Sequence, residues 1–262
     1  MSTPLDHRSY GRAQVHIFPS KDLSGQAAAS RAAGIIRDAI SKCGRARIVV
    51  ATGNSQLELI DALTHKESVD WDAVEAFHMD EYVGIAADHP ASFRHWIRNR
   101  VELAVHPAQV HYIVGDAPDL DAEIRRYTSL LFGGPIHLAF VGFGENGHIA
   151  FNDPAVADFA DPALLKRATL DDACRRQQVG EGHFPNLAAV PREALTITCP
   201  GLFRAEAWVC SVPDARKAEA VRNACEGPIS TICPASIVRT HPNASVYLDA
   251  ASAALLSTLT HG

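Results

Sequence analysis

Residues 138–154 read LAFVGFGENGHIAFNDP, an apolar run that leads directly into a glycine-rich turn. The apolar run is typical of a buried strand, and the glycines after it allow a sharp turn and a close approach to a ligand. In open α/β sheets the ligand site lies beyond the carboxyl ends of the strands. We therefore expect an α/β fold with its site at this turn, where His148 is able to exchange protons near neutral pH.

The same turn matches the dinucleotide-binding pattern G-x-G-x-x-G through Gly142, Gly144 and Gly147. That pattern requires a helix that begins within the loop, because the helix N-terminus receives the pyrophosphate. Here the chain continues to Asp153-Pro154, and the residue before a proline disfavours helix. The turn also lies in the middle of the chain rather than in a first βαβ unit. The sequence therefore favours a ligand other than a dinucleotide.

Short β-rich runs alternate with longer helical patterns, which is typical of an α/β fold with a mainly parallel sheet. The expected strands span residues 47–51, 73–78, 110–114, 136–141, 194–198, 207–212 and 245–248. The expected helices span residues 25–42, 56–65, 91–101, 120–131, 215–226, 229–238 and 250–259. We expect residues 1–262 to form a single domain, with the irregular segment 155–191 as a lid or binding segment.

Composition narrows the class of partner. The net charge of -6 argues against nucleic acid or an anionic membrane surface as the main partner. No segment has the length and apolarity of a membrane span, and the polar start lacks the apolar core of an export signal, so we expect a cytoplasmic protein. The six cysteines include no C-x-x-C pair and several lie in apolar runs, so we expect free thiols and no metal site.

Residues Thr52, Gly53, Asn54 and Ser55 follow an apolar strand pattern and precede a helical one. Such a junction presents unpaired backbone N–H groups and the positive end of a helix dipole, which suits a phosphate. The alternative is ordinary helix capping by Asn54 or Ser55. The local pattern leaves both interpretations open.

The strand pattern at residues 74–77 is followed closely by two adjacent carboxylates, Asp80 and Glu81. Neighbouring side chains of an extended chain point to opposite faces, so we expect only one of them to enter a given pocket. A pocket carboxylate is a candidate general base. The alternative is that both are solvated loop charges.

Two further groups of residues are candidates for the functional site. Asp153 lies close enough in sequence to pair with His148, to orient its imidazole and to raise its pKa. Asp214 is the natural N-cap of the helical pattern at 215–226, yet Arg216 and Lys217 follow it, and cations in a first turn oppose the helix dipole. Either these cations bind an anion held at the same helix end, or they are solvated surface charges.

Together these motifs resemble the glucosamine-6-phosphate deaminase family, within the larger group that includes the 6-phosphogluconolactonases. The resemblance covers most of the chain and keeps the motif order: TGNS at 52–55, MDEYVG at 79–84, DHPAS at 88–92, GENGHIAFNDP at 144–154, KA at 217–218 and EG at 226–227. The MDEY and GHIAFN strings are specific. Lactonases usually follow the Gly-His pair with Thr, so Ile149 favours the deaminase side.

The resemblance implies a doubly wound, Rossmann-like fold with helices on both faces of the sheet, and a ring-opening, isomerising deamination of an amino-sugar phosphate. It assigns Asp80 as the base that moves a proton between C2 and C1, His148 as the group that protonates the ring oxygen, and Asp153 as its partner. The phosphate would be held by Thr52, Gly53, Asn54, Ser55 and Lys217. The resemblance implies no metal or organic cofactor and is compatible with a homo-oligomer.

Three departures from the family pattern accompany the resemblance. The usual Asp before the Gly-His pair is Asn146, for which the neighbouring Glu145 is a candidate substitute. The usual Glu before the proline is the shorter Asp153. The usual phosphate-binding Arg aligns loosely with His183.

Two other functions remain as alternatives to the deaminase. One is a 6-phosphogluconolactonase-type hydrolase, and the other is a non-catalytic sugar-phosphate sensor. Ammonia release from glucosamine 6-phosphate separates the first from a deaminase, and any turnover excludes the second.

Overall fold

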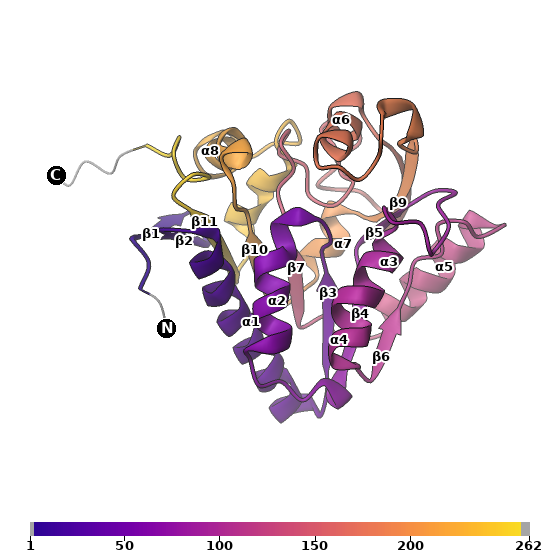
Figure 1. Ribbon diagram of the computed structural model, residues 1–262, viewed down its shortest axis with the longest axis horizontal. Helices are drawn as coiled ribbons and strands as arrows, with labels where there is room; N and C mark the ends of the chain where they lie inside the picture. The colour runs from indigo at the N-terminus through magenta and orange to yellow at the C-terminus, as the bar shows by residue number, and fades with distance from the viewer. Residues whose placement is uncertain (1–2, 258–262) are drawn as a thin grey trace.

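The computed structural model describes residues 3–257, and its centre is an eight-stranded sheet with the order β1-β2-β11-β10-β7-β3-β4-β6 (Figure 1). The strands are β1 Asp6–Tyr10, β2 Ala13–Phe18, β3 Ala46–Val50, β4 Val74–His78, β6 Gln109–His111, β7 Leu138–Val141, β10 Trp208–Ser211 and β11 Ala244–Asp249. All neighbours pair in parallel except β1 and β2. Strands β3, β7, β10 and β11 are buried along their whole length, as expected for a parallel sheet covered on both faces.

Helices flank this sheet, with α1 and α2 in front of it and α7 behind it in the view of Figure 1. The helices are α1 Lys21–Cys43, α2 Leu57–His65, α3 Phe93–Ile97, α4 Leu103–Val105, α5 Leu120–Leu131, α6 Asp172–Gly180, α7 Cys199–Phe203 and α8 Ala218–Glu226. Helix α1 packs closely on α2 because Gly25 has no side chain: a Cβ at this position would lie only 2.6 Å from the Cβ of Glu58. The expected doubly wound α/β fold is confirmed.

A second, smaller sheet lies beside the first. Its antiparallel strands have the order β5-β9-β8, with β5 at Asp80–Tyr82, β9 at Glu193–Ile197 and β8 at Leu165–Thr169. Because β4 ends at His78 and β5 begins at Asp80, the chain passes from the large sheet to the small one across Met79 alone. A separate apolar cluster, which includes Tyr82, Phe151 and Cys174, packs around this sheet and α6.

Most of the expected elements are present within a few residues. Helix α5 has the expected bounds, and the expected strands of the large sheet appear as β3, β4, β6, β7, β10 and β11. The expected helix at 215–226 begins with a 3₁₀ turn, Ala215–Lys217, and continues as α8. Among the described residues, no helix is both long and apolar enough for a bilayer crossing. All six cysteines are free.

Several expectations need correction. The strand expected at 194–198 belongs to the small antiparallel sheet, and the hairpin β1–β2, strand β8 and helix α6 were not expected. The helix expected at 91–101 is divided into α3, a π-helical turn at Arg98–Glu102 and α4. The helix expected at 229–238 is a 3₁₀ helix at Pro234–Thr240, because a proline fits the first turn of a helix better than its interior.

The helix expected at 250–259 is also wrong for the residues that are described. Residues 250–256 form turns, and residues 258–259 lie outside the described range. The Asp249 carboxylate accepts a hydrogen bond from the backbone N–H of Ser252 at 2.8 Å, which offers the chain a local turn in place of a helix. The alanine-rich composition of this segment therefore does not decide its conformation.

Candidate active site

The candidate site is a cavity of about 80 Å³ at the carboxyl ends of β3, β4 and β7. After β3 the chain builds outward through β4 and β6, and it then returns to the other side of β3 with β7. The cavity therefore lies at the topological switch point, where open α/β sheets bind ligands. It is lined by Ala51, Thr52, Gly53, Asn54, Ser55, Met79, Asp80, Phe93, Gly142, Phe143, Gly144, His148, Ala150, Phe151, Gln177, Gln178, Glu181 and Lys217.

A larger hollow of about 850 Å³ lies elsewhere, between α1 and the N-terminal strands. Its lining includes His16, Arg31, Arg37 and Tyr247, and it contains none of the residues expected in the site. Size alone therefore does not identify the site. The convergence of carboxylates, an imidazole and a lysine singles out the smaller cavity.

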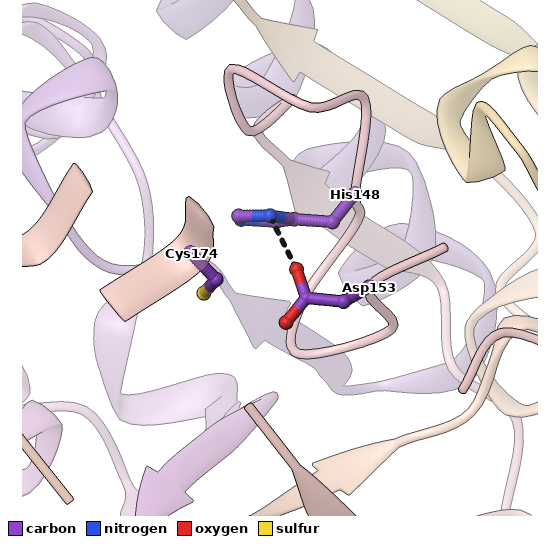
Figure 2. A group of neighbouring side chains, drawn as sticks. All are labelled: His148, Asp153 and Cys174. Carbon is purple, nitrogen blue, oxygen red and sulfur yellow. Dashed lines mark ion pairs between the residues drawn. The ribbon is translucent and has the colours of Figure 1, made fainter. Parts of the chain in front are cut away.

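His148 and Asp153 form a close pair in the turn after β7 (Figure 2). The Nδ1 atom of His148 lies 2.9 Å from Oδ1 of Asp153, and the Asp153 residue is fully buried. In Figure 2 the imidazole is seen edge-on with the carboxylate below it, and Nδ1 has no aligned hydrogen-bond partner among the described residues. Burial raises the pKa of Asp153, but hydrogen bonding and the charge of His148 outweigh burial and hold it below its ordinary value.

Asn146 connects both members of this pair. Its amide nitrogen donates to Oδ1 of Asp153 at 3.1 Å and to Oδ2 of Asp171 at 3.3 Å. Its amide oxygen accepts from the backbone N–H of His148 at 3.0 Å. A carboxylate at this position would face Asp153 and Asp171 without a proton to donate. Asn146, which replaces the usual Asp of the family pattern, therefore suits neighbours that accept hydrogen bonds.

The glycines of this turn serve the histidine. A Cβ at Gly144 would lie 2.2 Å from Cε1 of His148, so any side chain there would displace the imidazole. Gly147 has φ +81°, and a Cβ there would lie 2.6 Å from Sγ of Cys233. The turn is closed by the backbone N–H of Gly144, which donates to the carbonyl of His148 at 2.9 Å. These contacts give the G-x-G-x-x-G pattern a physical cause other than a dinucleotide.

Asp80 enters the cavity from the first position of β5. It is 5% exposed, and no hydrogen bond within the described residues reaches its carboxylate. Burial, followed by the charge of Glu81, raises the pKa of Asp80 well above its ordinary value. A carboxylate in this environment is a stronger base than one in water.

Glu81 points the other way and is fully buried. Its carboxylate accepts from the Ser92 hydroxyl at 2.7 Å and from the backbone N–H groups of Tyr82, Phe93 and Arg94 at 3.0, 3.1 and 2.9 Å. It therefore secures the N-terminus of α3 and is paired with the Arg94 guanidinium at 3.3 Å. The expectation that only one of the two carboxylates enters the pocket is consistent with this arrangement, and the solvated alternative is wrong for both.

The turn at Thr52–Ser55 lines the other side of the cavity. Gly53 has φ 98° and occupies the N-cap position of the 3₁₀ turn Asn54–Gln56, which leads into α2. No side chain caps this turn, so the alternative of ordinary capping by Asn54 or Ser55 is not observed. The helix end remains open toward the cavity.

Lys217 reaches the cavity from the turn before α8 and is 4% exposed. Its Nζ lies 3.8 Å from Oε1 of Glu181. Asp214, the expected N-cap, has φ 81° and makes no side-chain capping hydrogen bond. The solvated alternative is therefore wrong for Lys217, whereas Arg216 is partly exposed and lies 3.6 Å from Glu145.

Four expected site residues lie outside the cavity lining: Asn146 and Asp153 adjoin it through their contacts with His148, whereas Glu145 and His183 lie further away. Glu145 is exposed and faces Arg216, and His183 contacts Glu181, with Nε2 of His183 3.4 Å from Oε2 of Glu181. Three polar residues of the cavity are not predicted from the sequence: Gln177, Gln178 and Glu181, which α6 and its C-terminal end bring there. One available signal was Asp171, whose side chain accepts from the N–H of Cys174 at 2.6 Å and begins α6.

Cys174 adds a sulfur atom to the neighbourhood of the histidine pair (Figure 2). One donor atom from each of His148, Asp153 and Cys174 lies within 4.8 Å of the others. Burial, and then the charges of Asp153 and Asp171, raise the pKa of the Cys174 thiol. A metal ligand has to be a thiolate, so a bound cation would have to remove this proton against that shift.

Known proteins match this chain over most of its length. A family model described as glucosamine-6-phosphate isomerases/6-phosphogluconolactonase matches residues 19–247. A glucosamine-6-phosphate deaminase of Arthrobacter sp. (strain FB24) is 33% identical over 254 residues, which cover 93% of this chain and 92% of the relative. A glucosamine-6-phosphate deaminase of Exiguobacterium sibiricum is 35% identical over 210 residues, with 80% and 81% covered.

Solved structures agree with these matches. A monomeric glucosamine-6-phosphate deaminase superposes with a TM-score of 0.85 at 28% identity, covering 92% of this chain and 99% of the other. A 6-phosphogluconolactonase of Shewanella baltica OS155 superposes with a TM-score of 0.72 at 19% identity, covering 90% and 96%. The second match shows a shared fold.

Proposed function

Because this chain belongs to the family of glucosamine-6-phosphate isomerases and 6-phosphogluconolactonases, we propose that it deaminates glucosamine 6-phosphate or a close hexosamine phosphate. The reaction opens the sugar ring, isomerises the open chain, consumes one water and releases fructose 6-phosphate and ammonia. The observation that carries this proposal is that Asp80, the His148–Asp153 pair and Lys217 line or adjoin one cavity.

Ring opening needs a proton on the ring oxygen, and His148 is the candidate donor. Its ring lies over Gly144 and beside the buried Asp153 carboxylate, so its position is set from two sides. Asn146 keeps that carboxylate in place through its amide N–H.

Isomerisation moves a proton from C2 to C1, and Asp80 is the candidate base. A proton on carbon is weakly acidic, so the base has to be strong, close and shielded from water. The burial of Asp80 supplies the shielding and raises its basicity. A protonated amino group on C2 of the substrate would favour the ionised carboxylate, because opposite charges stabilise each other in a buried site.

The phosphate is assigned to the end of the cavity formed by Thr52–Ser55 and Lys217. The open helix end after β3 presents N–H donors, and Lys217 supplies a buried cation. Anchoring a remote phosphate would hold C1 and C2 in place against Asp80. Glu145 and His183 lie outside the cavity lining and have no contact role in this scheme.

We also infer that residues 155–191 act as a lid within a single domain, since α6 contributes Gln177 and Gln178 to the cavity roof and the residue after it contributes Glu181. The composition supports a cytoplasmic protein, and the net charge of -6 supports a small-molecule partner rather than nucleic acid. A homo-oligomer remains a prediction, which sedimentation velocity of the purified chain measures directly.

The proposed function is tested by following ammonia and fructose 6-phosphate from glucosamine 6-phosphate with the purified protein. Galactosamine 6-phosphate and 6-phosphogluconolactone are assayed alongside it. Release of both products in equal amounts from the glucosamine ester is expected. Turnover of the lactone alone would make the chain a hydrolase, and binding of all three without turnover would make it a sensor.

A further inference from the structure

The cavity contains a carboxylate that the proposed reaction does not use. Glu181 lines the same cavity as Lys217, and its side chain is 7% exposed. Its Oε1 lies 3.8 Å from Nζ of Lys217 and accepts a hydrogen bond from Nε2 of Gln177 at 2.8 Å. Its Oε2 faces Nε2 of His183 at 3.4 Å. Both oxygens therefore have partners inside the protein.

The charges around Lys217 are balanced before any ligand arrives. Burial raises the pKa of Glu181, but His183, Lys217 and Gln177 outweigh burial and lower it to about 2, so Glu181 is ionised at neutral pH. Beyond the cavity, Arg216 faces Glu145 at 3.6 Å. The pairs Lys217–Glu181 and Arg216–Glu145 together carry no net charge.

A phosphate ester carries close to two negative charges at neutral pH. Near Lys217 it would meet the Glu181 carboxylate in a buried region, where charges are poorly screened. A second anion beside Glu181 raises the free energy of binding through repulsion and must also share Lys217 with it. The cavity therefore opposes a dianion at the place where the proposed reaction puts one.

We propose that Glu181 is a specificity-determining residue that neutralises Lys217 and lowers the preference of the site for a phosphorylated over an unphosphorylated hexosamine. This inference rests on the proposed function for the position of the phosphate. The property that Glu181 senses is the charge of the group on C6. A ligand with a monoanionic or uncharged group on C6 therefore loses less binding free energy to repulsion by Glu181 than a ligand with a phosphate dianion does.

The position of Glu181 places its carboxylate in competition with a bound phosphate. It is the residue that follows α6, and its backbone carbonyl accepts from Nδ2 of Asn54 at 3.5 Å, in the turn assigned to the phosphate. A phosphate that binds there would contact the same turn and the same lysine. Glu181 and the phosphate are therefore competitors for one place.

The test compares Glu181→Gln, which keeps the shape and removes the charge, with Glu181→Asp, which keeps the charge. Calorimetry with inorganic phosphate is expected to show about tenfold tighter binding for Glu181→Gln, a size typical of one charge near a buried anion. The KM for glucosamine 6-phosphate should fall by a similar factor, with kcat changed little. Kinetics with unphosphorylated glucosamine should not change.

The control is Glu219→Gln, which removes an exposed charge on α8 outside the cavity. It should leave the phosphate affinity, and the KM and kcat with either substrate, as in the wild type. An unchanged or weaker phosphate affinity in folded Glu181→Gln overturns the inference, as does an equal gain in Glu181→Asp. Phosphate binding does not require turnover. Tighter binding without any ammonia release would therefore contradict the proposed function and leave the role of Glu181 standing.

Discussion

The floor and the roof of the cavity are built from different kinds of structure. The floor consists of the ends of β3, β4 and β7, whose backbones are fixed by parallel pairing and by a buried apolar core, and of the start of β5, which follows β4 after one residue. The roof is α6, which is tied to the rest of the protein by side chains: the Tyr82 hydroxyl donates to Gln178 at 2.8 Å, and the N–H of Glu145 donates to Gln177 at 3.0 Å. In the proposed function the floor carries the reacting residues Asp80 and His148, whereas the roof contacts the ligand.

The largest effect is expected from the floor residue Asp80. Asp80→Asn removes the candidate base but keeps the side-chain shape, so kcat should fall by about three orders of magnitude while sugar-phosphate binding persists. Stopped assays of ammonia release measure the loss, and calorimetry measures the binding. Asp38→Asn, an exposed change on α1, is the control. Wild-type turnover in Asp80→Asn would remove Asp80 from the mechanism.

The next largest effect is a loss of stability, which we expect for a change at Glu81 but not at the adjacent Asp80. Glu81→Gln breaks the buried contact with Arg94 and one or more hydrogen bonds at the start of α3, so the free energy of unfolding should fall by about 3 kcal/mol. Urea unfolding followed by circular dichroism measures it. Asp80→Asn should not lose stability, since the Asp80 carboxylate has no described hydrogen bond to lose. Equal losses in the two variants would contradict the division of roles.

The smallest effect is expected from the roof. Tyr82→Phe removes one hydroxyl, leaves Oε1 of Gln178 without its donor and should weaken the attachment of α6 by about 1 kcal/mol. The KM should rise by a few fold with kcat nearly unchanged, as steady-state kinetics would show. A fall in kcat equal to that of Asp80→Asn would mean that the roof takes part in the chemistry.

The sequence predicts the floor well because its signals are local. Apolar runs mark β3, β4 and β7, and a glycine turn after β7 marks the place of His148. The motifs also bring Asp80, Asp153 and Lys217 to or beside the cavity without any structural information. Each of these residues lies at or near the end of a strongly patterned element, where short-range rules apply.

The roof could not be predicted in the same way. Helix α6 buries polar side chains: Arg175 is 6% exposed and donates to the carbonyls of Leu187 and Val190 at 2.6 and 3.1 Å. In sequence such residues look like a solvated face. The separate fates of Asp80 and Glu81, and the position of Glu181 rather than His183 in the cavity, likewise depend on contacts that are distant in sequence.

The single residue Met79 between β4 and β5 has a mechanical consequence. Asp80 belongs to the small sheet, whereas His148 follows a strand of the large one. The candidate base and the candidate acid thus belong to two sheets, which Met79 links directly and which are also held together by the hydrogen bonds from the Phe151 N–H to Thr196 at 3.1 Å and from the Asn152 amide to the Ile197 carbonyl at 2.8 Å. A tilt of one sheet against the other would change the alignment of Asp80 with His148, so Met79 and these hydrogen bonds together fix the geometry of the site.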